Sequence, residues 1–173
     1  MKTLFRSTLI ASAVILAAGS LLAAGNGGGG KSCVGLVVSS DGNPGHGKGS
    51  FSVTSDSSLH FHFIVPPSVS VDAKELVTIQ LTTPNGHHYQ TIDLPVALAG
   101  TKESERQVHG YPFPLKVQQF AETKSNGKGA LHVEGSIPLA GSYIENYSLY
   151  GRWGAEASLG SGTPCSTSLT IAP

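Results

Sequence analysis

Residues 148–159 place the strongest constraint on the fold, because their side chains alternate between two chemical types. A β-strand sends successive side chains to opposite faces, so this period of two predicts one apolar and one polar face. The apolar face carries the only tryptophan of the chain. The alternation is typical of a central, half-buried antiparallel strand. The two faces are Leu149, Gly151, Trp153, Ala155, Ala157 and Leu159, and Ser148, Tyr150, Arg152, Gly154, Glu156 and Ser158.

The first 24 residues have the order of a secretory signal peptide. Lys2 and Arg6 precede an apolar run over 9–18, and small residues follow up to Ala24. The run is shorter than the ~20 residues that a membrane span needs. We therefore expect a signal peptide over 1–24, a glycine-rich linker over 25–31 and one domain over 32–173. The protein is then periplasmic or secreted.

The charge balance excludes two classes of partner. Once Lys2 and Arg6 are removed with the signal peptide, nine basic residues stand against eleven acidic ones. No basic cluster remains, which argues against nucleic acid and against anionic membranes. We also expect no membrane insertion of the mature chain.

The two cysteines, Cys33 and Cys165, lie near opposite ends of the mature domain. In an exported chain an isolated pair is more often a disulfide than two free thiols. Closing a loop of about 130 residues stabilises a fold by on the order of 4–5 kcal/mol in the chain-entropy model. We expect a bridge between the first and last strands; a metal site built on these two cysteines is the weaker alternative.

Turn signals divide the domain into about nine short strands without a helical period of useful length. Asn85-Gly86 is the strongest hairpin signal, and paired prolines interrupt the chain after residue 65 and near residue 113. This spacing indicates an all-β fold, an antiparallel β-sandwich rather than a barrel. The strands are expected near 32–39, 51–53, 59–65, 75–82, 88–94, 115–120, 129–134, 148–159 and 165–171. The expected core contains Trp153, Phe61, Phe63, Ile79, Leu81, Leu169 and Ile171.

The sequence contains none of the common catalytic motifs. There is no GxSxG, no HExxH and no phosphate-binding loop of the Walker type. We therefore expect a protein that is not an enzyme, and keep a small hydrolase as the third hypothesis. Such a hydrolase would need a pocket with convergent polar groups.

His60 and His62 are the candidate metal ligands. Two histidines at i and i+2 of a strand project from the same face, where they can share Zn²⁺ or Cu²⁺. A third ligand would come from His87, His88, His109 or His132. The alternative is an ordinary polar sheet face without a metal, in which case no cofactor is needed.

Four residues on or beside the tryptophan strand are the candidate binding residues. Tyr150, Arg152 and Glu156 are expected on its polar face, with Tyr147 nearby. Tyrosine and arginine are enriched where protein contacts contribute most binding energy. The alternative is a solvated face in which Arg152 and Glu156 compensate each other's charge.

The run from Leu139 through residues 148–153 to Ala157 resembles the late strands of bacterial immunoglobulin-like or fibronectin-type β-sandwiches. The shared feature is Gly-x-Trp on a strand near the end, here Gly151 and Trp153, followed by small residues. The cysteines depart from the antibody pattern, because they lie on terminal strands. The resemblance implies an immunoglobulin-like sandwich that serves in adhesion, spacing or assembly. The first hypothesis is thus an exported module that contacts an envelope or surface protein, or itself. The second is a periplasmic metal-binding protein.

Overall fold

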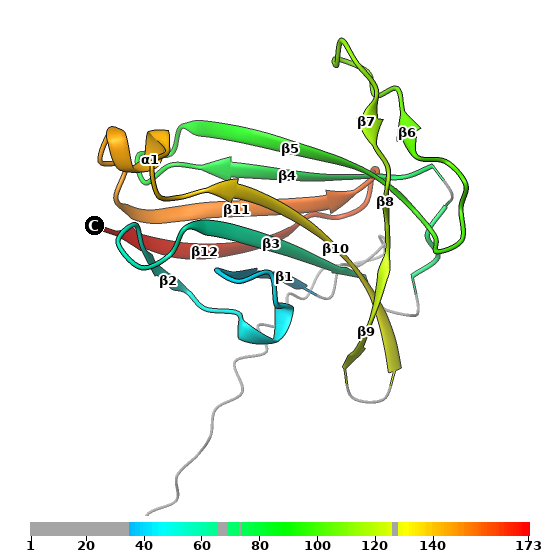
Figure 1. The fold of residues 1–173 in the computed structure, drawn as a ribbon, viewed down its shortest axis with the longest axis horizontal. Coiled ribbons are helices and arrows are strands. Elements are labelled where there is room, and N and C mark those ends of the chain that lie inside the picture. The colour runs from blue at the N-terminus through cyan, green and yellow to red at the C-terminus, as the bar shows by residue number, and fades with distance from the viewer. Residues whose placement is uncertain (1–34, 66–68, 73, 126–127) are drawn as a thin grey trace, which may run out of the picture.

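The computed structural model describes residues 35–65, 69–72, 74–125 and 128–173 (Figure 1). The expected signal peptide, the glycine-rich linker and Cys33 lie outside the described residues. Cys165 is the first residue of strand β12 and is partly buried. The Cys33–Cys165 bridge therefore stays a prediction.

The described chain is mostly β and forms two larger sheets. The first has four antiparallel strands in the order β1-β3-β10-β9. Backbone hydrogen bonds join neighbouring strands. In this order β3 and β10 are internal strands, and β1 and β9 are edge strands. The strands are β1 (Gly35–Ser39), β3 (Ser58–Val65), β10 (Lys128–Pro138) and β9 (Ala121–Ser125).

The second sheet has six strands in the order β2-β12-β11-β4-β5-β8. Its outermost pairs, β2 with β12 and β8 with β5, are parallel, and the inner pairs are antiparallel. The strands are β2 (Ser50–Ser52), β12 (Cys165–Ala172), β11 (Gly151–Leu159), β4 (Leu76–Thr82), β5 (His88–Ala97) and β8 (Gln118–Gln119).

Four smaller elements complete the described chain. Strands β6 (Glu105–Arg106) and β7 (Leu115–Lys116) pair as a separate hairpin, which projects beyond one end of the two sheets in Figure 1. A 3₁₀ turn, η1 (Pro44–His46), lies between β1 and β2, and the one-turn helix α1 (Tyr143–Asn146) precedes β11. The expectation of about nine strands is not confirmed: twelve are found in the described residues, because β6 and β9 were not expected and the strand expected near 115–120 is divided into β7 and β8.

The inner faces of both larger sheets contribute to a single hydrophobic core. All seven residues expected in the core are buried there, Phe61 and Phe63 from β3 and the other five from β4, β11 and β12. The two layers meet at Gly135 of β10, whose Cβ position lies 3.3 Å from methyl groups of Ile79, Ile92 and Leu94 on the opposite sheet. Removal of this apolar surface from water is the main stabilising contribution to the fold.

The strand expected at the centre of the fold is internal. β11 lies between β12 and β4, and its burial alternates as the sequence predicts, with Trp153, Ala155, Ala157 and Leu159 buried. Trp153 packs edge-on against Tyr89 of β5, with ring centroids 5.0 Å apart, and its Nε1 donates to the Leu149 carbonyl at 2.8 Å. The alternation of apolar and polar residues therefore predicted the buried face of this strand correctly.

The hairpin expected around Asn85-Gly86 joins β4 and β5. Gly86 has a φ of +79°, a conformation that costs glycine little. The backbone closes through Gly86 N–H to the Thr83 carbonyl at 2.9 Å and Thr83 N–H to the His87 carbonyl at 2.9 Å. The polar segment 101–107 is expected from its sequence to be a surface loop, with one short helical turn as an option; it contains β6, and a helical turn, α1, instead precedes β11.

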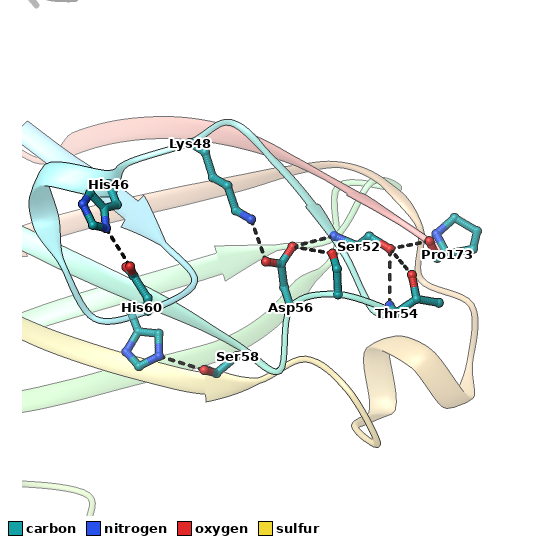
Figure 2. Close-up of polar contacts among 10 residues, drawn as sticks. His46, Lys48, Ser52, Thr54, Asp56, Ser58, His60 and Pro173 are labelled. Carbon is teal, nitrogen blue, oxygen red and sulfur yellow. Dashed lines mark hydrogen bonds and ion pairs between the residues drawn. The ribbon is translucent and has the colours of Figure 1, made fainter.

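A polar cluster fixes the segment around β2 to the C-terminal end of the chain (Figure 2). Asp56 is buried and accepts from Lys48 Nζ at 2.6 Å and from the Ser52 N–H at 2.9 Å. Ser52 Oγ donates to the Pro173 carbonyl at 2.6 Å. Burial by itself raises the pKa of Asp56, but the hydrogen bonds from Lys48 and Ser52 outweigh burial and lower it below the ordinary 3.8.

Asp56→Asn is expected to make the free energy of unfolding depend less on pH in the acidic range. A carboxyl group with a lowered pKa in the folded state contributes stability above its unfolded pKa and loses it as the pH falls through the folded pKa. For Asp56 that window begins at the ordinary 3.8 and extends below it. Denaturant unfolding of wild type and variant near neutral pH and at about pH 3 measures this. The difference between the two proteins should shrink at the lower pH; an equal difference at both would contradict the assignment.

No helix in the described ranges is long and apolar enough to cross a membrane.

Candidate functional site

The helix α1 is a fixed turn at one end of the sheets. Ser142 is its N-cap: the Ser142 Oγ accepts from the Ile144 N–H at 3.1 Å and donates to the Leu139 carbonyl at 2.7 Å. The Glu145 carboxylate accepts from the Gly141 N–H at 2.5 Å. Capping groups of this kind satisfy backbone N–H groups that a helix terminus leaves without partners.

Burial anchors the same turn. The side chain of Ile144 is fully buried in the core, and the Ile144 carbonyl accepts from the Leu149 N–H at 2.9 Å. Ser148 takes a φ of +52°, an unusual value for a residue with a side chain, and turns the chain into β11. Hydrogen bonds at both ends of α1 and the burial of the Ile144 side chain in the core therefore fix its backbone.

Two tyrosines on this turn form a stacked pair that faces solvent, here called the tyrosine platform (Tyr143 and Tyr147). Their ring centroids are 4.9 Å apart and the planes are inclined by 11°. Both side chains stay exposed, Tyr143 at 66% and Tyr147 at 65%. Residues four apart on a helix share a face, which explains the stacking. Among the described residues, the other exposed large hydrophobic side chains are Leu98 and Phe113.

The other residues expected to bind a partner differ in how far their side chains are exposed. Arg152 and Glu156 are exposed on the polar face of β11, as predicted. Tyr150 lies just before β11 and packs, partly buried, against the core, so the expectation that Tyr150 lines the polar face of the strand is wrong. Tyr147 is exposed at the C-cap of α1, where its neighbour is Tyr143. Arg152 donates to Ser168 Oγ on β12 at 3.2 Å.

His60 and His62 lie on the outer face of β3, and both point toward the Glu134 carboxylate on β10. His60 Nδ1 lies 2.5 Å from Glu134 Oε1, and His62 Nδ1 lies 3.9 Å from Glu134 Oε2. His60 Nε2 also forms a hydrogen bond with Ser58 Oγ at 2.7 Å. The shared face was predicted from the spacing, whereas Glu134 was not among the expected neighbours.

His62 is fully buried and forms a hydrogen bond through Nε2 with Ser39 Oγ at 2.9 Å. Burial lowers the pKa of His62, and Glu134 opposes that change. Ser39, His62 and Glu134 have the residue types of a serine hydrolase triad. The geometry differs from a working triad, because Ser39 is also fully buried and the carboxylate is 3.9 Å from His62 Nδ1. A substrate cannot reach the Ser39 hydroxyl in this conformation.

The part of the chain that the structure describes does not bring a third histidine into a metal-binding group with His60 and His62. Of the four expected candidates, His132 lies beside His62, with ring centroids 6.1 Å apart. His88 pairs with Thr91 at the start of β5, and His87 and His109 lie in exposed connections. Across the described residues, no group of three or more histidine, cysteine, aspartate or glutamate side chains is arranged to hold a metal ion. Zn²⁺ or Cu²⁺ binding by His60 and His62 stays a prediction.

Comparison with known proteins does not assign the chain. No family model matches the sequence, and no curated protein shows significant similarity to it.

Two of the functional candidates, Tyr143 and Glu134, were not predicted from the sequence. Tyr143 is not among the expected binding residues, because the sequence pattern gives it and Ile144 only as the connection that leads into the tryptophan strand. The available signal was Ser142 followed three residues later by Glu145, the spacing of a helix N-terminus. Glu134 was missed because the pairing of β3 with β10 joins residues 74 positions apart.

Proposed function

We propose that this chain is a non-enzymatic, exported module of immunoglobulin-like β-sandwich architecture that makes protein–protein contacts. The tyrosine platform carries the proposal. It exposes two stacked rings at 66% and 65% on a turn that is capped and anchored. An isolated exposed ring is common on protein surfaces, whereas a pre-ordered pair has already lost its conformational freedom before a partner arrives.

Tyrosine suits protein recognition for physical reasons. Its ring offers a large apolar area with only two side-chain torsions to order, and its hydroxyl group tolerates water until the contact forms. Binding energy concentrates at a few such residues. Arg152 and Glu156, exposed on the adjoining strand, are proposed as polar residues at the rim of the contact.

The proposal of a non-enzymatic role is supported by the burial of Ser39 and His62 together with the absence of a catalytic motif in the sequence. Export is supported by the signal-peptide pattern over 1–24. Metal binding remains the alternative hypothesis, favoured by the shared face of His60 and His62 and by the Glu134 carboxylate that both rings face.

Site-specific photo-cross-linking in the native host tests the contact. A photoreactive amino acid is placed at Tyr147, at Glu156 on β11, or at Ser136, which is exposed on β10 of the opposite sheet. We expect one dominant cross-linked protein from position 147, a weaker yield of the same protein from 156, and none from 136. Equal yields from 147 and 136 would contradict a contact at the tyrosine platform.

A further inference from the structure

The Glu134 carboxylate on the outer face of the first sheet is faced by two histidine rings from the neighbouring strand. Glu134 on β10 is the register partner of His62 on β3, and His60 lies two residues earlier on the same face of β3. The Nδ1 atoms of the two rings lie 2.5 Å and 3.9 Å from the carboxylate oxygens of Glu134. Two imidazole nitrogens and one carboxylate, all ligand types that divalent transition metals accept, therefore converge.

A serine hydroxyl group orients the far side of each ring. His60 Nε2 forms a hydrogen bond with Ser58 Oγ at 2.7 Å (Figure 2). His62 Nε2 forms one with Ser39 Oγ at 2.9 Å. In the tautomer with hydrogen on Nε2, each serine accepts a hydrogen bond and each Nδ1 presents a lone pair toward Glu134. Metal-binding histidines usually have such a partner on the nitrogen that does not bind the metal, because it fixes the ring orientation.

His62 Nδ1 is a buried polar atom whose hydrogen-bonding capacity is not used. The side chain of His62 is 0% exposed, and among the described residues its Nδ1 has no hydrogen-bond partner. Nearly all buried polar atoms in native proteins have a partner, and an exception requires an explanation such as an ion. A cation at this position binds the Nδ1 lone pair and offsets the negative charge of Glu134.

The structure leaves both space and access for a small ion beside these atoms. Gly42, in the connection after β1, has no side chain, and a Cβ atom built on it would lie 3.6 Å from both Glu134 Oε2 and His60 Nδ1. The missing side chain thus leaves open a volume of about one methyl group next to two of the three donors. Glu134 and His60 are partly exposed, at 34% and 20%, so that an ion can enter from solvent.

We propose that His60 Nδ1, His62 Nδ1 and the Glu134 carboxylate bind one Zn²⁺ ion, with water in the fourth position. Two histidines and one glutamate form a known tetrahedral donor set for Zn²⁺. With bonds of about 2.0–2.1 Å, neighbouring ligand atoms are about 3.3 Å apart. The present separations of 2.5 Å and 3.9 Å lie on either side of that value, so the three groups do not yet surround a common point. Rotation of the partly exposed Glu134 side chain lengthens the first separation and shortens the second.

This inference does not rest on protein–protein contact at the tyrosine platform, because none of its residues belongs to that surface. It assigns to the metal-binding alternative a third ligand, Glu134, and one nitrogen on each ring. The two proposals fail separately: loss of Zn²⁺ binding leaves the cross-linking result at Tyr147 unchanged, and absence of cross-linking leaves Zn²⁺ binding unchanged.

Zn²⁺ titration of the tag-free mature protein by calorimetry tests the site, with thermal unfolding in Zn²⁺ or in a chelator as the second readout. We expect one Zn²⁺ per chain and a higher midpoint of unfolding when Zn²⁺ is present. Glu134→Gln keeps the shape of the side chain and should weaken Zn²⁺ binding about tenfold or more, as should His60→Gln. Circular dichroism checks that both variants fold.

His88→Gln is the matched control, because His88 is an exposed histidine of the other sheet that pairs with Thr91. Its affinity for Zn²⁺ should equal that of the wild type. A wild type without saturable Zn²⁺ binding would overturn the inference. Equal affinity of the wild type and folded Glu134→Gln would also overturn it, since the ion would then be held without the carboxylate. A loss in His88→Gln as large as that in His60→Gln would place the ion elsewhere and overturn it too.

Discussion

Replacing Trp153 by alanine is expected to lower the free energy of unfolding by about 3–5 kcal/mol, the range for removing a large aromatic side chain from a core. Trp153 is 2% exposed and is the largest side chain of the internal strand β11. The substitution leaves a cavity, removes the edge-on contact with Tyr89 and leaves the Leu149 carbonyl without the indole donor. Urea unfolding followed by far-ultraviolet circular dichroism measures the loss.

Arg152→Ala is the matched control for Trp153, because it changes the neighbouring residue on the opposite face of the same strand. Arg152 is exposed and donates one hydrogen bond to Ser168. Surface substitutions of this kind change stability by about 0.5 kcal/mol or less. If both variants lost the same amount, the assignment of the buried and exposed faces of β11 would be wrong.

Gly135→Val is expected to cost about 1–3 kcal/mol through overpacking. Gly135 is buried on β10, and its Cβ position lies 3.3 Å from Ile79 Cδ1, Ile92 Cγ2 and Leu94 Cδ1. Valine adds two more carbon atoms beyond that position, where the opposite sheet leaves no room. Thermal or denaturant unfolding of this variant measures how closely the two sheets approach.

A second substitution tests the physical cause of the Gly135→Val loss. Ile79→Val removes the Cδ1 methyl that Gly135 faces and alone should cost about 0.5–1.5 kcal/mol. If the sheets face each other as described, the double variant should be more stable than the sum of the two losses predicts. Strict additivity would mean that the two residues are not in contact.

The β-strands could be predicted where one face of a strand is buried and the other is solvated. The alternation in β11 and β4 places Trp153, Ile79 and Leu81 in the core, and all three are buried there. The hairpin at Asn85-Gly86 was likewise predicted from its turn residues. These features depend on neighbours in the chain, which a sequence pattern records directly.

The pairing of distant strands could not be predicted in the same way. Sheet order joins β10 to β3 and β12 to β2, and no periodicity in the chain encodes such partners. Two-residue strands such as β6 and β8 carry too few residues for a period to appear. The position of Glu134 between His60 and His62 follows from this pairing and was missed for that reason.

The candidate binding residues also divide into those whose positions could be predicted from the sequence and those whose positions could not. Arg152 and Glu156 were placed on the correct face because they lie inside a regular strand. Tyr150 was misplaced because the strand begins one residue later, after a turn in which Ser148 takes a positive φ. Tyr143 and Tyr147 face the same way only because a helical turn forms between two extended segments.

Covalent labelling of tyrosines in the native host tests the central claim most directly. The chain has five tyrosines, of which Tyr143 and Tyr147 are the two classed as exposed in the described residues, so both should react first in dilute purified protein. We predict that both become protected in the cell relative to the partly buried Tyr89, because a partner covers them. The same ratio of labelling in the cell and in dilute solution would contradict a contact at the tyrosine platform.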